Sequence, residues 1–137
     1  MKKLLLLTIL GLTLLTSCEN MDDKVSGVWT IKGIYQNNES IFDTLSSTGF
    51  LVNKDKTCTF PLININNRHT SKEVGTWKTL KKGEQYYLQI ITDNELFNDT
   101  YEIKSWEKVM DEKTYGYAIV MFLESDKTKM ELHRSDF

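Results

Sequence analysis

Residues 25–35 read VSGVWTIKGIY, and this stretch decides the fold. Apolar or small residues recur at every second position from Val25 through Trp29 to Tyr35, while Thr30 and Lys32 lie between them. Alternation with a period of two is typical of a β-strand that buries one face. The pattern therefore predicts a strand in which the residues of the Trp29 parity, Tyr35 included, point inward.

Similar apolar runs continue along the chain, and turn residues separate them. They predict seven further strands, at 49–54, 57–65, 73–80, 85–92, 98–109, 115–125 and 129–134. Residues 41–48 are ambiguous between a loop and a short helical lid. Strands joined by short turns, without helices between them, are typical of antiparallel barrels and sandwiches. We therefore expect an all-β fold, an eight-stranded antiparallel up-and-down barrel, and eight strands suffice to enclose one small ligand.

The N-terminus has the pattern of an exported protein. Lys2 and Lys3 precede an apolar stretch at 4–15, which is shorter than the ~20 residues that a membrane-spanning helix needs. A basic start, an apolar centre and small residues before a cleavage site form a secretory signal. The following LTSC, residues 15–18, resembles the lipobox of bacterial lipoproteins, in which the cysteine sulfur receives a diacylglyceryl group.

This resemblance implies a signal peptide at 1–17, a lipidated tether at 18–24 and a barrel domain at 25–137. Lipid on Cys18 would anchor the protein in the cell envelope, at the outer membrane, on its periplasmic or its surface-exposed face. Residues 19–24 are polar and acidic, and we expect such a segment to stay solvated and mobile. They resemble the leaders that route some lipoproteins of Bacteroidetes-type bacteria to the outer face, and a plain spacer is the alternative.

The composition limits the partners and the covalent chemistry. Removal of residues 1–17 takes two of the 17 basic residues and none of the 19 acidic ones, so the remaining 120 residues carry a net charge of −4. An acidic domain argues against a nucleic-acid partner, which needs a basic face. With Cys18 lipidated, Cys58 has no second cysteine for an intramolecular disulfide. We expect Cys58 to be a small buried apolar residue.

Gly27-Val28-Trp29 is similar to the Gly-x-Trp motif near the start of lipocalins. The likeness extends loosely over residues 25–134, although the Thr-Asp-Tyr loop motif and the long helix of that family are missing. The whole resembles short lipocalin-like lipoproteins of Bacteroidetes-type bacteria. In lipocalins the tryptophan plugs the closed end and a basic residue of the last strand covers its ring. The resemblance implies that Arg134 covers Trp29 here, with His133 facing outward.

The sequence contains no recognisable catalytic or metal-binding pattern. His69 lies in a polar loop and His133 near the end of the chain. The spacing of histidine, cysteine and carboxylate residues fits neither a zinc site nor a calcium loop, and no glycine-rich phosphate loop is present. We therefore expect no enzymatic activity, no metal and no cofactor.

The aromatic residues are the remaining candidates for a site. An apolar pocket with a few polar tips suits a small hydrophobic molecule. The leading expectation is therefore a barrel that binds or sequesters such a ligand, as the lipocalin resemblance implies. The alternative is an envelope structural or protein-interaction module in which the same side chains fill the core and the rim makes the contacts. A third is an inhibitor-like module that presents the loop 64–71. The candidate ligand-binding residues are Tyr35, Phe50, Trp77, Tyr101 and Phe122.

Overall fold

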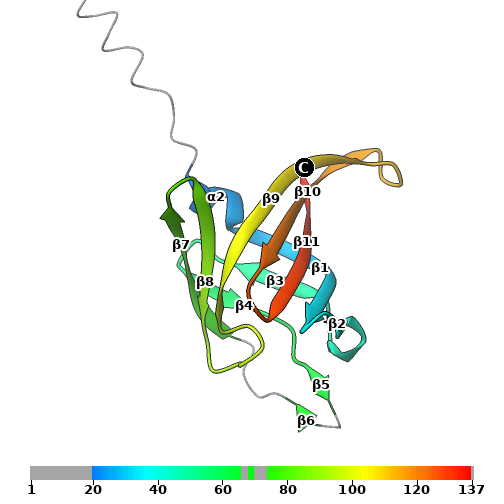
Figure 1. Ribbon diagram of the computed structural model, residues 1–137. Coiled ribbons are helices and arrows are strands. Elements are labelled where there is room, and N and C mark those ends of the chain that lie inside the picture. Colours follow the sequence, from blue (N-terminus) through cyan, green and yellow to red (C-terminus); the bar gives the residue numbers. More distant parts are fainter. Residues whose placement is uncertain (1–19, 66–67, 70–73, 137) are drawn as a thin grey trace, which may run out of the picture.

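The computed structural model describes residues 20–65, 68–69 and 74–136. The predicted signal peptide, Cys18 and part of the loop 64–71 lie outside these residues. A short helix precedes a series of strands, and the chain forms one barrel with a helix at one end (Figure 1). The elements are α2 (Met21–Val25), β1 (Gly27–Gln36), β2 (Glu39–Ser40), a 3-10 turn η1 (Phe42–Thr44), β3 (Gly49–Val52), β4 (Thr57–Thr59), β5 (Asn64–Ile65), β6 (Arg68–His69), β7 (Val74–Lys82), β8 (Gln85–Ile91), β9 (Asp99–Asp111), β10 (Gly116–Glu124) and β11 (Thr128–Asp136).

Eight of the strands form a closed antiparallel barrel. They are joined in the order β11-β10-β9-β8-β7-β4-β3-β1, and pairing of β11 with β1 completes the circle. The short β2 adds to β1 as an extra strand, and β5 pairs with β6 in a separate hairpin. Each barrel strand lies beside its neighbours in the chain, so the predicted all-β, eight-stranded up-and-down barrel is confirmed.

A β-bulge in β1 changes which residues face the core. The register against β11 shifts between Ile31 and Gly33, so the residue between them adds one position to β1. Trp29 and Ile31 are buried before the bulge, and Ile34 is buried after it. The prediction that Tyr35 shares the inward parity of Trp29 is therefore wrong, and 47% of Tyr35 is exposed.

The two ends of the barrel differ in what covers them. Helix α2 lies at the same end as the β3–β4, β7–β8 and β9–β10 turns and the end of β11, and we call this the α2 end (Figure 1). The opposite end carries η1, the β4–β7 connection, the β8–β9 loop and the β10–β11 turn, and we call it the loop end. The segment 41–48, left ambiguous by the sequence, contains one 3-10 turn.

The β9–β10 hairpin is longer than the strands beside it. Strand β8 pairs with β9 only over residues 99–102 of the described chain, whereas β10 pairs with β9 up to Asp111. The distal part of the hairpin, residues 107–118, extends as an arm at the α2 end (Figure 1). We refer to these residues as the arm.

The tether expectation for residues 18–24 needs a correction. Residues 21–24 belong to helix α2 and pack on the barrel, so they are not a mobile linker. The Asn20 side chain accepts a hydrogen bond from the Asp22 N–H (3.1 Å) and caps the helix. A helix this short is stable only with tertiary contacts. Helix α2 has such contacts at Asp22, which bonds to Thr79, and at Lys24, whose carbonyl oxygen accepts from Trp106.

Candidate functional site

Trp29 lies in the core at the α2 end of the barrel. Its side chain is fully buried, and its indole Nε1–H donates to the Val25 carbonyl oxygen at 2.7 Å. The guanidinium carbon of Arg134 lies 4.6 Å from the centre of the indole ring. The Arg134 guanidinium also donates to the Ser26 carbonyl oxygen. Strand β11 therefore places a cation across the tryptophan of β1, which is the barrel-closing arrangement expected for Gly27, Trp29 and Arg134.

Gly27 is required by this arrangement for two reasons. Its φ of +144° is a conformation that residues with a side chain rarely adopt. A Cβ atom at Gly27 would lie 2.8 Å from Nη1 and 2.9 Å from Cδ of Arg134. The glycine of the motif thus leaves the space that the arginine side chain fills.

The other two tryptophans repeat the arrangement at the same end of the barrel. Trp77 Nε1–H donates to the Asn53 carbonyl oxygen at 2.8 Å, and the Lys56 ammonium lies 4.1 Å from its ring centre. Trp106 Nε1–H donates to the Lys24 carbonyl oxygen at 3.3 Å, and the Lys24 ammonium lies 5.0 Å from its ring centre. All three tryptophans of the chain are therefore held by a backbone oxygen and covered by a cation.

Asp22 attaches helix α2 to the barrel. Its carboxylate accepts hydrogen bonds from the Lys56 ammonium and the Thr79 hydroxyl. Partial burial opposes ionisation, but the two hydrogen bonds and the charge of Lys56 outweigh it and hold the pKa of Asp22 below its ordinary value. Asp22 is thus a charged link between α2 and strand β7.

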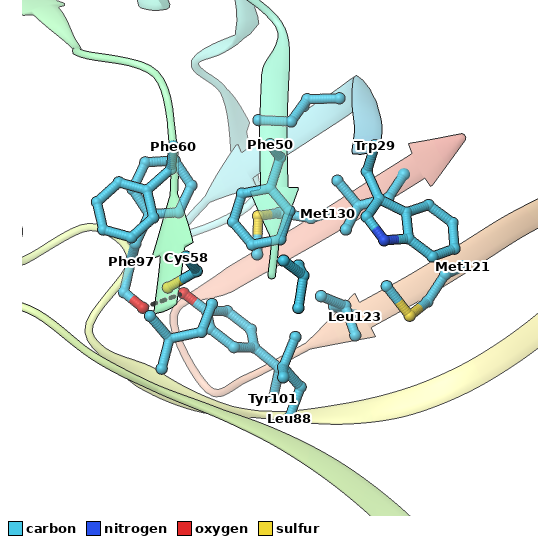
Figure 2. Close-up of a cluster of buried hydrophobic side chains, with 14 of the residues drawn as sticks. Trp29, Phe50, Cys58, Phe60, Leu88, Phe97, Tyr101, Met121, Leu123 and Met130 are labelled. Carbon is cyan, nitrogen blue, oxygen red and sulfur yellow. Dashed lines mark hydrogen bonds between the residues drawn. The ribbon is translucent and has the colours of Figure 1, made fainter. Parts of the chain in front are cut away.

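The barrel interior is filled by aromatic side chains toward the loop end (Figure 2). The ring centres of Phe60 and Phe97 lie 4.6 Å apart, and those of Phe50 and Phe97 lie 6.2 Å apart. The Tyr101 hydroxyl donates within the β8–β9 loop, where the Leu96 and Phe97 carbonyl oxygens lie 3.2 and 3.1 Å away. Burial raises the pKa of Tyr101 above its ordinary value. Tyr101 therefore fixes the loop that carries Phe97 across the loop end.

Aliphatic and sulfur-containing side chains complete the core. Leu88, Met121, Leu123 and Met130 surround the aromatic group and are buried (Figure 2). Cys58 is buried among them as expected, and burial raises its pKa to about 11 although a backbone hydrogen bond from Gly75 lowers it. Among the described residues, every buried side-chain nitrogen or oxygen has a hydrogen-bond partner. Such a core leaves no unsatisfied polar group to orient a ligand.

The five candidate ligand-binding residues do not form one site. Phe50, Trp77 and Tyr101 are buried parts of the core. Tyr35 and Phe122 lie on the outer surface, with 47% and 39% of their areas exposed. Phe122 faces outward because its neighbours in β10, Met121 and Leu123, face the core. The expectation that all five line one pocket is therefore wrong for Tyr35 and Phe122.

The sequence reasoning missed two groups of residues that shape this region. Phe60 lies within the predicted strand 57–65 but was not among the candidate residues, and Phe97 comes from the β8–β9 loop, where no alternation reveals inward residues. The helix that binds Trp106 was missed because it has only five residues. Asn20 followed by acidic residues is an N-cap signal that could have revealed it.

Two shallow grooves lie on the outer surface of the described part of the chain. One of about 490 Å³ lies over β1, β10 and β11, and the expected outward-facing His133 lines it. His133 Nε2 is 2.6 Å from a Glu131 carboxylate oxygen. The other groove, of about 400 Å³, lies over β8 and β9 beside the β10–β11 turn and has several carboxylates. The residues lining the first are Val28, Thr30, Lys32, Asp111, Ala118, His133, Arg134 and Ser135, and those lining the second are Lys82, Tyr87, Asp99, Thr100, Glu102, Glu124, Ser125 and Asp126.

Two features are absent from the described residues, 20–65, 68–69 and 74–136. These residues contain no group of three or more histidine, cysteine or carboxylate side chains placed to hold a metal ion. They also contain no helix with the length and hydropathy needed to cross a membrane. Comparison of the chain with protein-family models, curated proteins and solved structures found no match.

Proposed function

We propose that the chain is a lipid-anchored lipoprotein of the outer membrane, with a lipocalin-like barrel that serves as a packed scaffold and makes its contacts through its outer surface. The proposal includes no enzymatic activity. The observation that carries it is the filled interior: Phe97 stacks on Phe50 and Phe60, and Arg134 covers the ring of the buried Trp29. The support for the anchor is the signal pattern that ends at Cys18.

Replacement of the lipidation site tests the anchor. We expect Cys18→Ser to abolish incorporation of an alkyne-labelled fatty acid in the native host and to move the protein out of the membrane fraction. Cys58→Ala is the matched control, because its thiol is buried in the barrel, and it should keep both the label and the membrane association. Normal labelling of the Cys18→Ser variant would refute the proposed anchor.

A second candidate function is binding of a small hydrophobic molecule, and one observation favours it. The side chains that close the loop end, Phe60 and Phe97, belong to irregular segments rather than to strands. Irregular segments open at lower free-energy cost than strands of a closed sheet. Movement of the Phe97 loop would expose the apolar interior to a ligand.

A fluorescent probe distinguishes these functions. The packed scaffold predicts that N-phenyl-1-naphthylamine shows no saturable fluorescence increase with the unmodified protein. Phe97→Ala should open a cavity and bind the probe, as engineered apolar cavities bind small aromatic molecules. Saturable binding to the unmodified protein, in the micromolar range, would favour the carrier.

A further inference from the structure

The chain between the proposed anchor and the folded barrel is very short. Cys18 lies two positions before Asn20, the cap of α2, and two residues span at most about 7 Å. Helix α2 cannot easily detach to lengthen this connection, because Asp22 bonds to β7 and Trp106 bonds to the Lys24 carbonyl. A lipid on Cys18 would therefore hold the α2 end of the barrel against the bilayer.

The arm lies at this same end (Figure 1), and it carries exposed apolar side chains. Met110 and Tyr117 are directly opposite in the β9–β10 register, and 61% and 51% of their areas are exposed. Tyr115, in the turn of the arm, is 87% exposed. Its φ of +53° is a conformation in which turns favour glycine or asparagine. The arm thus offers three large apolar or aromatic side chains to its surroundings.

The arm carries little net charge. Lys108 and Lys113 stand beside Glu107, Asp111 and Glu112, so residues 107–118 have a net charge of −1. The Lys108 ammonium lies 4.8 Å from the ring centre of Tyr117. Tyrosine at the headgroup level, with lysine extending its charge toward water, is the arrangement typical of membrane–water interfaces. A net charge of −1 gives no attraction to anionic lipid, so the apolar side chains would supply the contact.

We propose that the arm is a second membrane contact, in which Met110, Tyr115 and Tyr117 enter the boundary between headgroups and acyl chains of the bilayer that holds the lipid of Cys18. The inference rests on the proposed lipid anchor. The bilayer is the occupant that fits because the anchor and the arm lie at one end of the barrel. The barrel then stands on the membrane, with the loop end directed away from it.

Spin labels on the lipidated full-length protein test this orientation in vesicles of phosphatidylcholine. Glu112→Cys places a label in the turn of the arm and leaves the three apolar side chains intact. Asp126→Cys is the matched control, an exposed acidic residue in the β10–β11 turn at the loop end. Cys58 is buried and will not compete for the label under native conditions. Oxygen, which concentrates in the bilayer, and a water-soluble nickel chelate then report the surroundings of each label.

We expect the label at residue 112 to collide more with oxygen than with the nickel chelate, and the label at residue 126 to show the reverse. Replacement of Met110, Tyr115 and Tyr117 by serine, in protein with unchanged far-UV circular dichroism, should return the first label to the values of the second. Equal, water-like accessibility at both positions, in protein shown by mass spectrometry to carry acyl chains, would overturn the inference alone. Protection of label 112 from both reagents would also overturn it, because it would mean a protein partner. Absence of acyl chains on Cys18 would overturn the anchor and the inference together.

Discussion

Replacement of Trp29 should cost a large part of the stability of the domain. The Trp29 side chain is fully buried. Its replacement by alanine leaves a cavity that the strands of a closed barrel cannot move inward to fill. Comparable tryptophan-to-alanine changes cost about 3–5 kcal/mol, within a total of about 5–15 kcal/mol for an ordinary domain. Trp29→Phe keeps most of the volume but leaves the Val25 carbonyl oxygen without its donor, at a cost of about 1–3 kcal/mol.

The measurement is urea unfolding at pH 7, followed by far-UV circular dichroism on chains that lack residues 1–17 and carry Cys18→Ser. A double-mutant cycle with Arg134→Met isolates the contact between guanidinium and indole, and we expect a coupling of about 0.5–2 kcal/mol. A loss below about 1 kcal/mol for Trp29→Ala would show that the tryptophan does not close the barrel. Additivity in the cycle would show that Arg134 acts independently of it.

Three further variants test the α2 end and the core. Gly27→Ala should destabilise the domain by about 1–3 kcal/mol, because the φ of Gly27 is positive and the added Cβ meets the Arg134 side chain. Gly49→Ala is the control, since no atom lies within 4 Å of an added Cβ there, and it should leave the urea midpoint nearly unchanged. Equal effects of the two variants would contradict the close approach of Arg134 to Gly27. Because folding lowers the pKa of Asp22 from 3.8, its link to Lys56 stabilises the fold above that pH and is lost as the pH falls through the lower, folded value. Asp22→Asn should therefore reduce the free energy of unfolding by about 1 kcal/mol or less at pH 7, and by a smaller amount near pH 2. Asp23→Asn is the control variant. A loss of stability that is the same at both pH values would contradict the charged link. Cys58, with its pKa raised to about 11, should resist a thiol reagent at pH 8 until urea unfolds the barrel, and rapid reaction of the native protein would show that the core is open.

Strand positions could be predicted from the sequence because one face of each barrel strand is buried. The alternation around Trp29 places it in the core, and the parity of β11 directs Arg134 inward, because both depend only on the local period. For the same reason β7 to β11 lie within a few residues of their predicted bounds. The contact of Arg134 with the Trp29 ring was expected only from the lipocalin resemblance.

What the sequence could not predict depends on contacts between distant segments. The bulge at Lys32 is a property of the pairing of β1 with β11, so its effect on Tyr35 does not show in either strand alone. Helix α2 is too short to be stable without Trp106, which lies 82 residues further along the chain. Phe97 reaches the core from a loop held by Tyr101, where periodicity carries no information.

The measurement that tests the central claim most directly is native mass spectrometry of the protein purified from its host membrane, before and after extraction with organic solvent. A packed, lipid-anchored scaffold predicts a mass equal to the chain that begins at Cys18 plus its covalent acyl groups, unchanged by the extraction. A stoichiometric additional mass that the solvent removes would contradict the packed scaffold and establish a carrier. A chain without acyl groups would contradict the anchor.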